Sequence, residues 1–202
     1  MKKLVLSILA VSALAFTTQA QTEAGKWLVG GSVSFNSSKA DGASKSDTKF
    51  EILPSAGYFV AENIAIGTAI GYSSEKTFAP LVSLQSNAFQ VKPFVRAYKG
   101  VNDQFKFFGQ LSVPVGFGNV KAGNADGDNM TKIGNLNGVG VALSPGVAFF
   151  PSKRIGIELS VDGIEYNDLK GEDANGNKVS GNKNFSIGAD FFAPHLGVQF
   201  YF

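Results

Sequence analysis

The chain has 202 residues, no Cys, and 18 Lys and Arg against 16 Asp and Glu. The lack of Cys excludes disulfides, a cysteine-linked lipid anchor and Cys/His catalysis, and the near balance of charge argues against nucleic acid as a partner. Its 24 Gly, 18 Phe and repeated Asn-Gly and Asp-Gly pairs predict strands and turns in a single domain.

The first predicted element is a secretory signal peptide over residues 1–20. Lys2 and Lys3 precede an apolar stretch over residues 4–16, and the small-residue site Thr18-Gln19-Ala20 follows it. The stretch is shorter than the roughly 20 residues of a membrane-spanning helix. We expect cleavage after Ala20, which leaves one domain over residues 21–202. Cleavage removes two of the 18 basic residues and no acidic one, so the mature formal charge is 16 − 16 = 0.

The segment that starts at Ile64 shows the clearest strand pattern. Its even positions read Ile64, Ile66, Thr68, Ile70 and Tyr72, and its odd positions hold only Ala, Gly and Ser up to residue 73. Successive side chains of a strand point to opposite faces, so one face is bulky and apolar while the other is nearly empty. This is typical of a strand between lipid and a confined interior.

The same alternation predicts seven further strands, at about residues 26–36, 48–59, 88–98, 104–117, 136–149, 155–165 and in a final strand that ends at Phe202. Eight strands of about ten residues match the length that crosses a bilayer at a tilt near 45°. In the final strand the parity of Phe185 and Ile187 differs from that of Leu196 and Val198. We therefore expect a register shift, such as a β-bulge, at residues 192–195 around Pro194.

The predicted connections alternate in length along the chain. Short ones fall near residues 60–63, 99–103 and 150–154, and long ones near residues 37–47, 74–86, 118–135 and 166–183. Short periplasmic turns that alternate with long external loops are the outer-membrane arrangement. The sequence thus predicts an all-β, eight-stranded antiparallel up-and-down transmembrane barrel with four mobile external loops.

Outward-facing aromatic residues are predicted at two heights of this barrel, as girdles at the two membrane interfaces. The girdle near the short turns comprises Trp27, Tyr58, Phe105, Phe149 and Phe202, and the girdle near the long loops comprises Phe35, Phe50, Tyr72, Phe89 and Phe117.

Charged residues of mixed sign are predicted inside the barrel: Glu51, Lys92, Arg96, Lys106, Glu158, Asp162 and Asp190. Charges held away from bulk water require partners. We expect an ionic network across the lumen, with Arg96 paired to Glu158. Such a network either fills and stiffens the barrel or acts as a gate.

Four segments resemble the OmpA/OmpX-like family of outer-membrane β-barrels. They are the hairpin over residues 58–67, the run over residues 91–98, the hairpin over residues 144–158 and the closing residues 197–202. The resemblance implies the outer membrane of a Gram-negative bacterium, with its lipid and lipopolysaccharide as surroundings, and a monomer. The C-terminal Phe202 resembles the signal that the outer-membrane assembly machinery reads.

The resemblance does not define an activity, because such barrels carry many functions. We expect a non-enzymatic protein that acts in envelope integrity or in surface interaction through its external loops. The alternatives are a narrow or gated porin-like channel, a soluble exported lipocalin-like barrel and a lipid-modifying enzyme, which would have to use the single His195. We expect no cofactor and no metal: residues 124–129 and 172–177 resemble parts of calcium loops, but both lack the terminal Glu.

Overall fold

The computed structural model describes residues 21–42, 44–188 and 194–202. Among them no helix has the length and apolarity needed to span a bilayer. The strands are β1 (Trp27–Ser38), β2 (Asp47–Ala61), β3 (Ile64–Phe78), β4 (Ser83–Gly100), β5 (Phe105–Ser112), β6 (Val115–Gly123), β7 (Thr131–Ser152), β8 (Ile155–Ser160), β9 (Ile164–Asp173), β10 (Lys178–Ile187) and β11 (His195–Tyr201).

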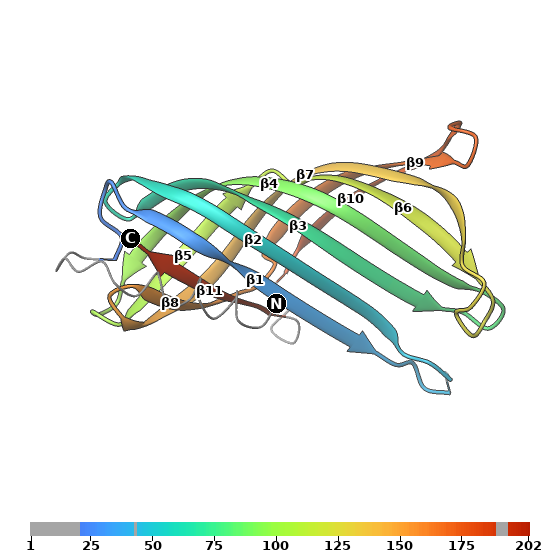
Figure 1. Ribbon diagram of the computed structural model, residues 1–202, viewed down its shortest axis with the longest axis horizontal. Helices are drawn as coiled ribbons and strands as arrows, with labels where there is room; N and C mark the ends of the chain where they lie inside the picture. Colours follow the sequence, from blue (N-terminus) through green and yellow to red (C-terminus); the bar gives the residue numbers. More distant parts are fainter. Residues whose placement is uncertain (1–20, 43, 189–193) are drawn as a thin grey trace, which may run out of the picture.

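Antiparallel pairing closes these strands into a ring at the end that carries the short turns (Figure 1). The pairs run from β1 through β2, β3, β4, β5, β7, β8 and β11 back to β1, which makes eight strands around the circumference. Closure removes every free sheet edge at this level. The predicted eight-stranded antiparallel barrel is confirmed.

β5 and β6 are two parts of one barrel strand, separated at Val113 and Pro114. Phe94 pairs with Ser112, and Val91 pairs with Val115, so the register is continuous across the gap. Pro114 has no backbone N–H to donate, so the ladder is interrupted there. The sequence predicted this strand as a single piece over residues 104–117.

Two other barrel strands change register where they are interrupted. Between β8 and β9 the pairing with β7 shifts by one residue, from Gly146–Ser160 to Leu143–Ile164. Alternation with Leu159 along the predicted strand at residues 155–165 would place Val161 on the outer face, but because of this β-bulge its side chain is buried, at 8% exposed.

The second change lies between β10 and β11. Ile187 pairs with Ile164, and His195 pairs with Ser160. Between these two pairs the last strand therefore contains eight residue steps, from 187 to 195, whereas the neighbouring strand contains only four, from 160 to 164. Exposed Ile187 and Leu196 show the predicted change of parity, but residues 189–193, which include two of the four residues of the predicted bulge, lie outside the described residues.

At the opposite end of the barrel the strands extend as long hairpins (Figure 1). β3 and β4 pair as far as Phe78 and Ser83, and β6 and β7 pair as far as Ala122 and Thr131. Only residues 39–46, 79–82, 124–130 and 174–177 connect these strands. The predicted long loops are thus long hairpins, because strand pairing accounts for most of each one.

The two faces of the barrel wall differ as the alternation predicts. Ile66, Ile70 and Leu159 are 46%, 46% and 43% exposed on the outside, whereas Arg96 and Glu158 are 6% and 4% exposed inside. An outer surface of Val, Ile, Leu and aromatic side chains suits contact with lipid, and the lumen holds the polar groups.

Candidate functional site in the barrel lumen

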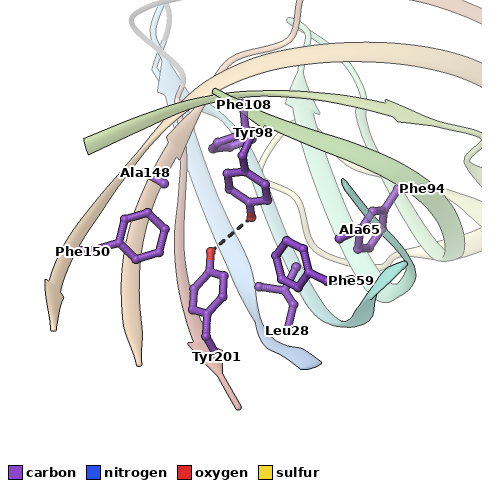
Figure 2. Packing of buried hydrophobic residues seen from close by; sticks show 9 residues of the cluster. All are labelled: Leu28, Phe59, Ala65, Phe94, Tyr98, Phe108, Ala148, Phe150 and Tyr201. Carbon is purple, nitrogen blue, oxygen red and sulfur yellow. Dashed lines mark hydrogen bonds between the residues drawn. The ribbon is translucent and has the colours of Figure 1, made fainter. Parts of the chain in front are cut away.

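A cluster of buried side chains fills the lumen at the short-turn end. We call it the aromatic plug, and Figure 2 shows its members pointing inward from different strands. They are Leu28, Phe59, Ala65, Phe94, Tyr98, Phe108, Ala148, Phe150 and Tyr201.

Glycines on the neighbouring strands make room for the rings of the plug. A Cβ on Gly67 would lie 2.6 Å from Cζ of Phe94, and a Cβ on Gly146 would lie 2.3 Å from Cζ of Phe108. The nearly empty face of one strand is therefore filled by rings from another.

Among the plug side chains, between Tyr98 and Phe94, Arg96 on β4 pairs with Glu158 on β8 across the lumen. Nη1 of Arg96 lies 2.7 Å from Oε2 and 2.8 Å from Oε1 of Glu158. Nε and Nη2 of Arg96 both donate to Oε1 of Gln110 on β5, at 2.9 and 2.7 Å. The guanidinium also lies 4.6 Å from the centre of the Phe108 ring, within the range of a cation–π contact.

The plug and the ion pair are joined by two tyrosine hydroxyls. Tyr98 and Tyr201 donate to Oε1 of Glu158 at 3.1 and 3.0 Å. Their hydroxyl oxygens are 3.1 Å apart, as the dashed line in Figure 2 marks. Both charges thus have opposite charge and hydrogen-bond partners, which a buried pair requires. The network ties β4, β5, β8 and β11 together.

A second polar group lies nearer the hairpin end. Nε2 of Gln90 donates to Oε2 of Glu51 at 3.0 Å. The His195 ring faces two carboxylates, with Nδ1 3.8 Å from Glu51 and Nε2 3.4 Å from Asp162. Lys92 lines the same cavity as Asp162 and His195. The space open to water in this cavity is about 50 Å³, which holds only a few molecules.

Of the predicted lumen charges, one lies at the short-turn end and one lies outside the described residues. Lys106 does not join the Arg96 network: its Nζ lies 2.5 Å from Oγ1 of Thr22 and 3.2 Å from Oδ1 of Asn63, at the short-turn end. Asp190 lies outside the described residues.

The predicted girdle residues face outward and pair across strands. Near the short turns Trp27 pairs with Tyr58, and Phe105 pairs with Phe149, which is half-exposed. The ring centres of these two pairs are 5.3 and 4.9 Å apart. Near the hairpins the cross-strand pairs are Phe35 with Phe50, Tyr72 with Phe89, and Phe89 with Phe117.

The C-terminal Phe202 is exposed and held to the first strand. Its N–H donates to the carbonyl of Trp27, and its carbonyl accepts from the Trp27 N–H, both at 3.0 Å. These two bonds complete the junction of β11 with β1. The role of Phe202 in assembly stays a prediction.

The two calcium-like segments form turns. Oδ1 of Asp173 accepts from the N–H groups of Asn175 and Asn177, both at 2.8 Å, and Oδ1 of Asn124 accepts from the Asp128 N–H at 2.8 Å. Hydrogen bonds from the side chain and backbone of Asn177 hold the pKa of Asp173 below its ordinary value. Within the described ranges no group of three His, Cys, Asp or Glu could hold a metal ion.

The hairpin tips contact one another. Lys45, in the β1–β2 connection, pairs with Asp126 in the β6–β7 connection. Lys45 and Lys76 lie 5.5 and 5.2 Å from the ring centre of Phe78. These contacts link three hairpins, and we call them the tip cluster.

Comparison with known proteins identifies the family of this fold. Residues 6–198 match the family model described as the outer membrane protein beta-barrel domain. The chain belongs to this family. It is therefore an outer-membrane β-barrel protein of a Gram-negative bacterium, and lipid surrounds its apolar outer face. No curated protein matches the chain.

Several solved structures are similar to this family member at low identity. The outer membrane protein OprG from Pseudomonas aeruginosa is 14% identical, with a TM-score of 0.50 over 91% of this chain and 99% of its own. Neisserial surface protein A is 14% identical, with a TM-score of 0.48 over 89% and 98%. Ail of Yersinia pestis is 15% identical, with a TM-score of 0.44 over 89% and 99%.

Sequence reasoning missed most of the aromatic plug. Phe59, Phe94, Tyr98, Phe108 and Phe150 face inward, yet they were not among the predicted lumen residues. The sequence could have shown their orientation, because each lies two residues, or a multiple of two, from a residue predicted to face inward. Tyr98 and Phe94, for example, flank Arg96 at two-residue spacing. The glycines on neighbouring strands were the second sign that large side chains fit inside.

Proposed function

We propose that this protein is a non-enzymatic barrel that transports nothing through its lumen and acts through its extracellular hairpins in surface interaction. The observation that carries the proposal is the filled lumen, in which the aromatic plug surrounds the Arg96–Glu158 pair. A lumen of eight strands is just wide enough to be filled by side chains. The surface that remains available to a partner is formed by the paired hairpins that extend beyond the upper girdle.

The tip of the β3–β4 hairpin is a candidate contact point. Leu81 is 89% exposed at this tip. An apolar side chain so exposed gains from burial against a partner, up to about 1.5–3 kcal/mol for a Leu. The tip cluster around Phe78 holds the neighbouring hairpins beside it, which lowers the entropy lost on binding.

Complementation of a deletion strain tests the proposal. We expect cells that carry Leu81→Ser to adhere to their natural surface about as weakly as cells of the deletion strain. We expect the same variant to give detergent resistance equal to that of the wild type. The matched control is Val101→Ser, since Val101 is 60% exposed in a turn at the opposite end of the barrel. If deletion leaves adherence intact and sensitises cells to detergent, surface interaction is refuted in favour of the second candidate, envelope integrity. Unchanged adherence in the Leu81 variant refutes the role of this tip.

The alternative functions have less support in the geometry. Catalysis by a Ser/His/acid site would need a Ser hydroxyl on His195, and among the described residues no hydrogen bond joins His195 to a serine. A lipocalin-like carrier would need a polar outer face, whereas the outer face here is apolar. A gated channel would need the plug as well as the ion pair to move.

A further inference from the structure

Two lysines face each other on the outer side of the hairpin that β6 and β7 form at the far end of the barrel (Figure 1). Lys121 on β6 and Lys132 on β7 are direct cross-strand partners, and Lys121 also pairs with Gln85 on β4. Lys121 has the parity of Phe117, which is 57% exposed on the outer face. Like charges directly opposite each other in an antiparallel pair repel. The two ammonium groups therefore destabilise the hairpin when nothing lies between them.

The neighbouring strands supply no carboxylate to compensate this charge. Asp126 and Asp128, in the connection between β6 and β7, are the nearest acidic residues along the chain. Within the described ranges neither Lys121 nor Lys132 takes part in an ion pair or a side-chain hydrogen bond. The parts of β4, β6 and β7 beyond the predicted upper girdle contain no Asp or Glu; these are residues 83–88, 118–123 and 131–136.

The β9–β10 hairpin shows how the same fold balances such charges. It sets Lys183 opposite Asp168 and Lys178 opposite Glu172, and opposite charges in cross-strand pairs attract. The β6–β7 hairpin has Lys on both strands instead. Its counter-charge has to come from outside these strands.

The position of the lysine pair along the strand suits the headgroups of the outer leaflet. Lys121 lies four residues beyond Phe117 of the predicted upper girdle. At about 3.3 Å per residue and a tilt near 45°, this is roughly 9 Å further from the membrane core. Between the two levels Asn119 pairs with Asn87 on β4 and Asn135 on β7. Aromatic rings, amides and amines thus follow one another outwards, and we call the three asparagines the amide row.

The central member of the amide row has an unmet hydrogen-bond acceptor. Oδ1 of Asn119 is buried and has no hydrogen-bond partner among the residues that the structure describes. A buried acceptor without a donor is costly. Rotation of the amide towards the surface would give this oxygen a donor such as a sugar hydroxyl.

We propose that Lys121 and Lys132 bind a phosphate group of a phosphorylated glycolipid in the outer leaflet, with the amide row against its sugar. Lys binds phosphate as a point charge with three donors. One phosphate between two ammonium groups replaces their repulsion by two attractions. Lipopolysaccharide, the glycolipid that surrounds a barrel in this membrane, carries phosphate on its lipid-anchored sugars. Its acyl chains would lie on the apolar wall beside Phe117. This site does not depend on the proposed surface interaction.

Native mass spectrometry of the purified mature protein released from detergent micelles tests the site, with bisphosphorylated lipid A as the probe. We expect the wild type to retain lipid A, and the double variant Lys121→Gln with Lys132→Gln to retain at least five times less. The matched control is Lys99→Gln with Lys153→Gln, which removes the same charge from exposed positions at the short-turn end. Its retention should stay within a factor of two of the wild type.

Two further probes separate the possible sources of binding. We expect dephosphorylated lipid A to be retained equally weakly by the wild type and the double variant, and equimolar inorganic phosphate to leave lipid A bound. Equal retention of lipid A by these two proteins would overturn the proposal. If the wild type retains both forms of lipid A equally, acyl chains alone are recognised and the phosphate site is refuted. Displacement by inorganic phosphate would indicate a site for soluble anions and overturn the assignment to a lipid.

Lys132→Glu separates binding from folding. This substitution sets a carboxylate opposite Lys121, so in phosphatidylcholine vesicles we expect a urea midpoint at least as high as that of the wild type. Lipid A in the vesicles should raise the midpoint of the wild type and leave that of the variant unchanged, because a ligand stabilises only the folded state that binds it. An equal rise in both proteins would refute the role of the lysine pair.

Discussion

Replacement of Arg96 by Ala is expected to destabilise the barrel by about 3–5 kcal/mol, the usual cost of leaving one member of a buried ion pair without its partner. Glu158 is 4% exposed and would keep only the two tyrosine hydroxyls as donors. Urea-induced unfolding in lipid vesicles, followed by tryptophan fluorescence, measures the change.

Two controls distinguish this charge effect from a loss of volume. The double variant Arg96→Met with Glu158→Leu removes both charges, and we expect its stability within about 1–2 kcal/mol of the wild type, because apolar residues often replace a buried pair without loss. Lys45→Ala breaks the exposed pair with Asp126, whose side chains are 36% and 75% exposed, and should cost under about 1 kcal/mol. A loss in Arg96→Ala no larger than in Lys45→Ala would contradict the described network.

The second large effect is expected on the outer face. Leu143 lies on β7 midway between Phe149 in the predicted lower girdle and Asn137, which pairs with Phe117 of the predicted upper girdle. Leu143→Lys should cost about 2–4 kcal/mol, the penalty of a Lys at the bilayer midplane. Vesicle unfolding titrations measure the loss.

Ile133→Lys is the matched control, since Ile133 faces outward on the same strand beyond the upper girdle. The two side chains are almost equally exposed, at 42% and 46%. In water both substitutions would have similar small effects, so equal stabilities for the two variants would refute lipid contact at Leu143.

Much of this fold could be predicted from side-chain alternation alone. Side chains alternate between the two faces of a strand, so a short stretch of sequence is enough to tell its apolar face from its polar face. Ile66 and Arg96 were therefore assigned to the correct faces. The pairing of Arg96 with Glu158 was predicted because charges held away from bulk water require partners. The bulge at Val161 was not predictable, because one inserted residue changes the parity without a distinctive residue type.

The plug and the hairpins were missed for different reasons. Tyr98 and Phe150 lie at predicted strand ends, where aromatic residues were assigned to girdles or left out. Long connections between strands were interpreted as loops because both faces of these segments carry polar residues, such as Ser74 and Asn119. Beyond the membrane a strand has no apolar face to reveal it, since water surrounds both sides.

Planar-bilayer recording of the purified wild-type protein and of its Arg96→Ala variant tests the central claim, that side chains fill the lumen. We predict no conductance steps in either protein, because the plug around Phe59, Phe150 and Tyr201 blocks the path even when the ion pair that it surrounds is broken. Stable single-channel openings in the wild-type protein would contradict the account, and openings that appear only in the variant would show that the Arg96–Glu158 pair is a gate.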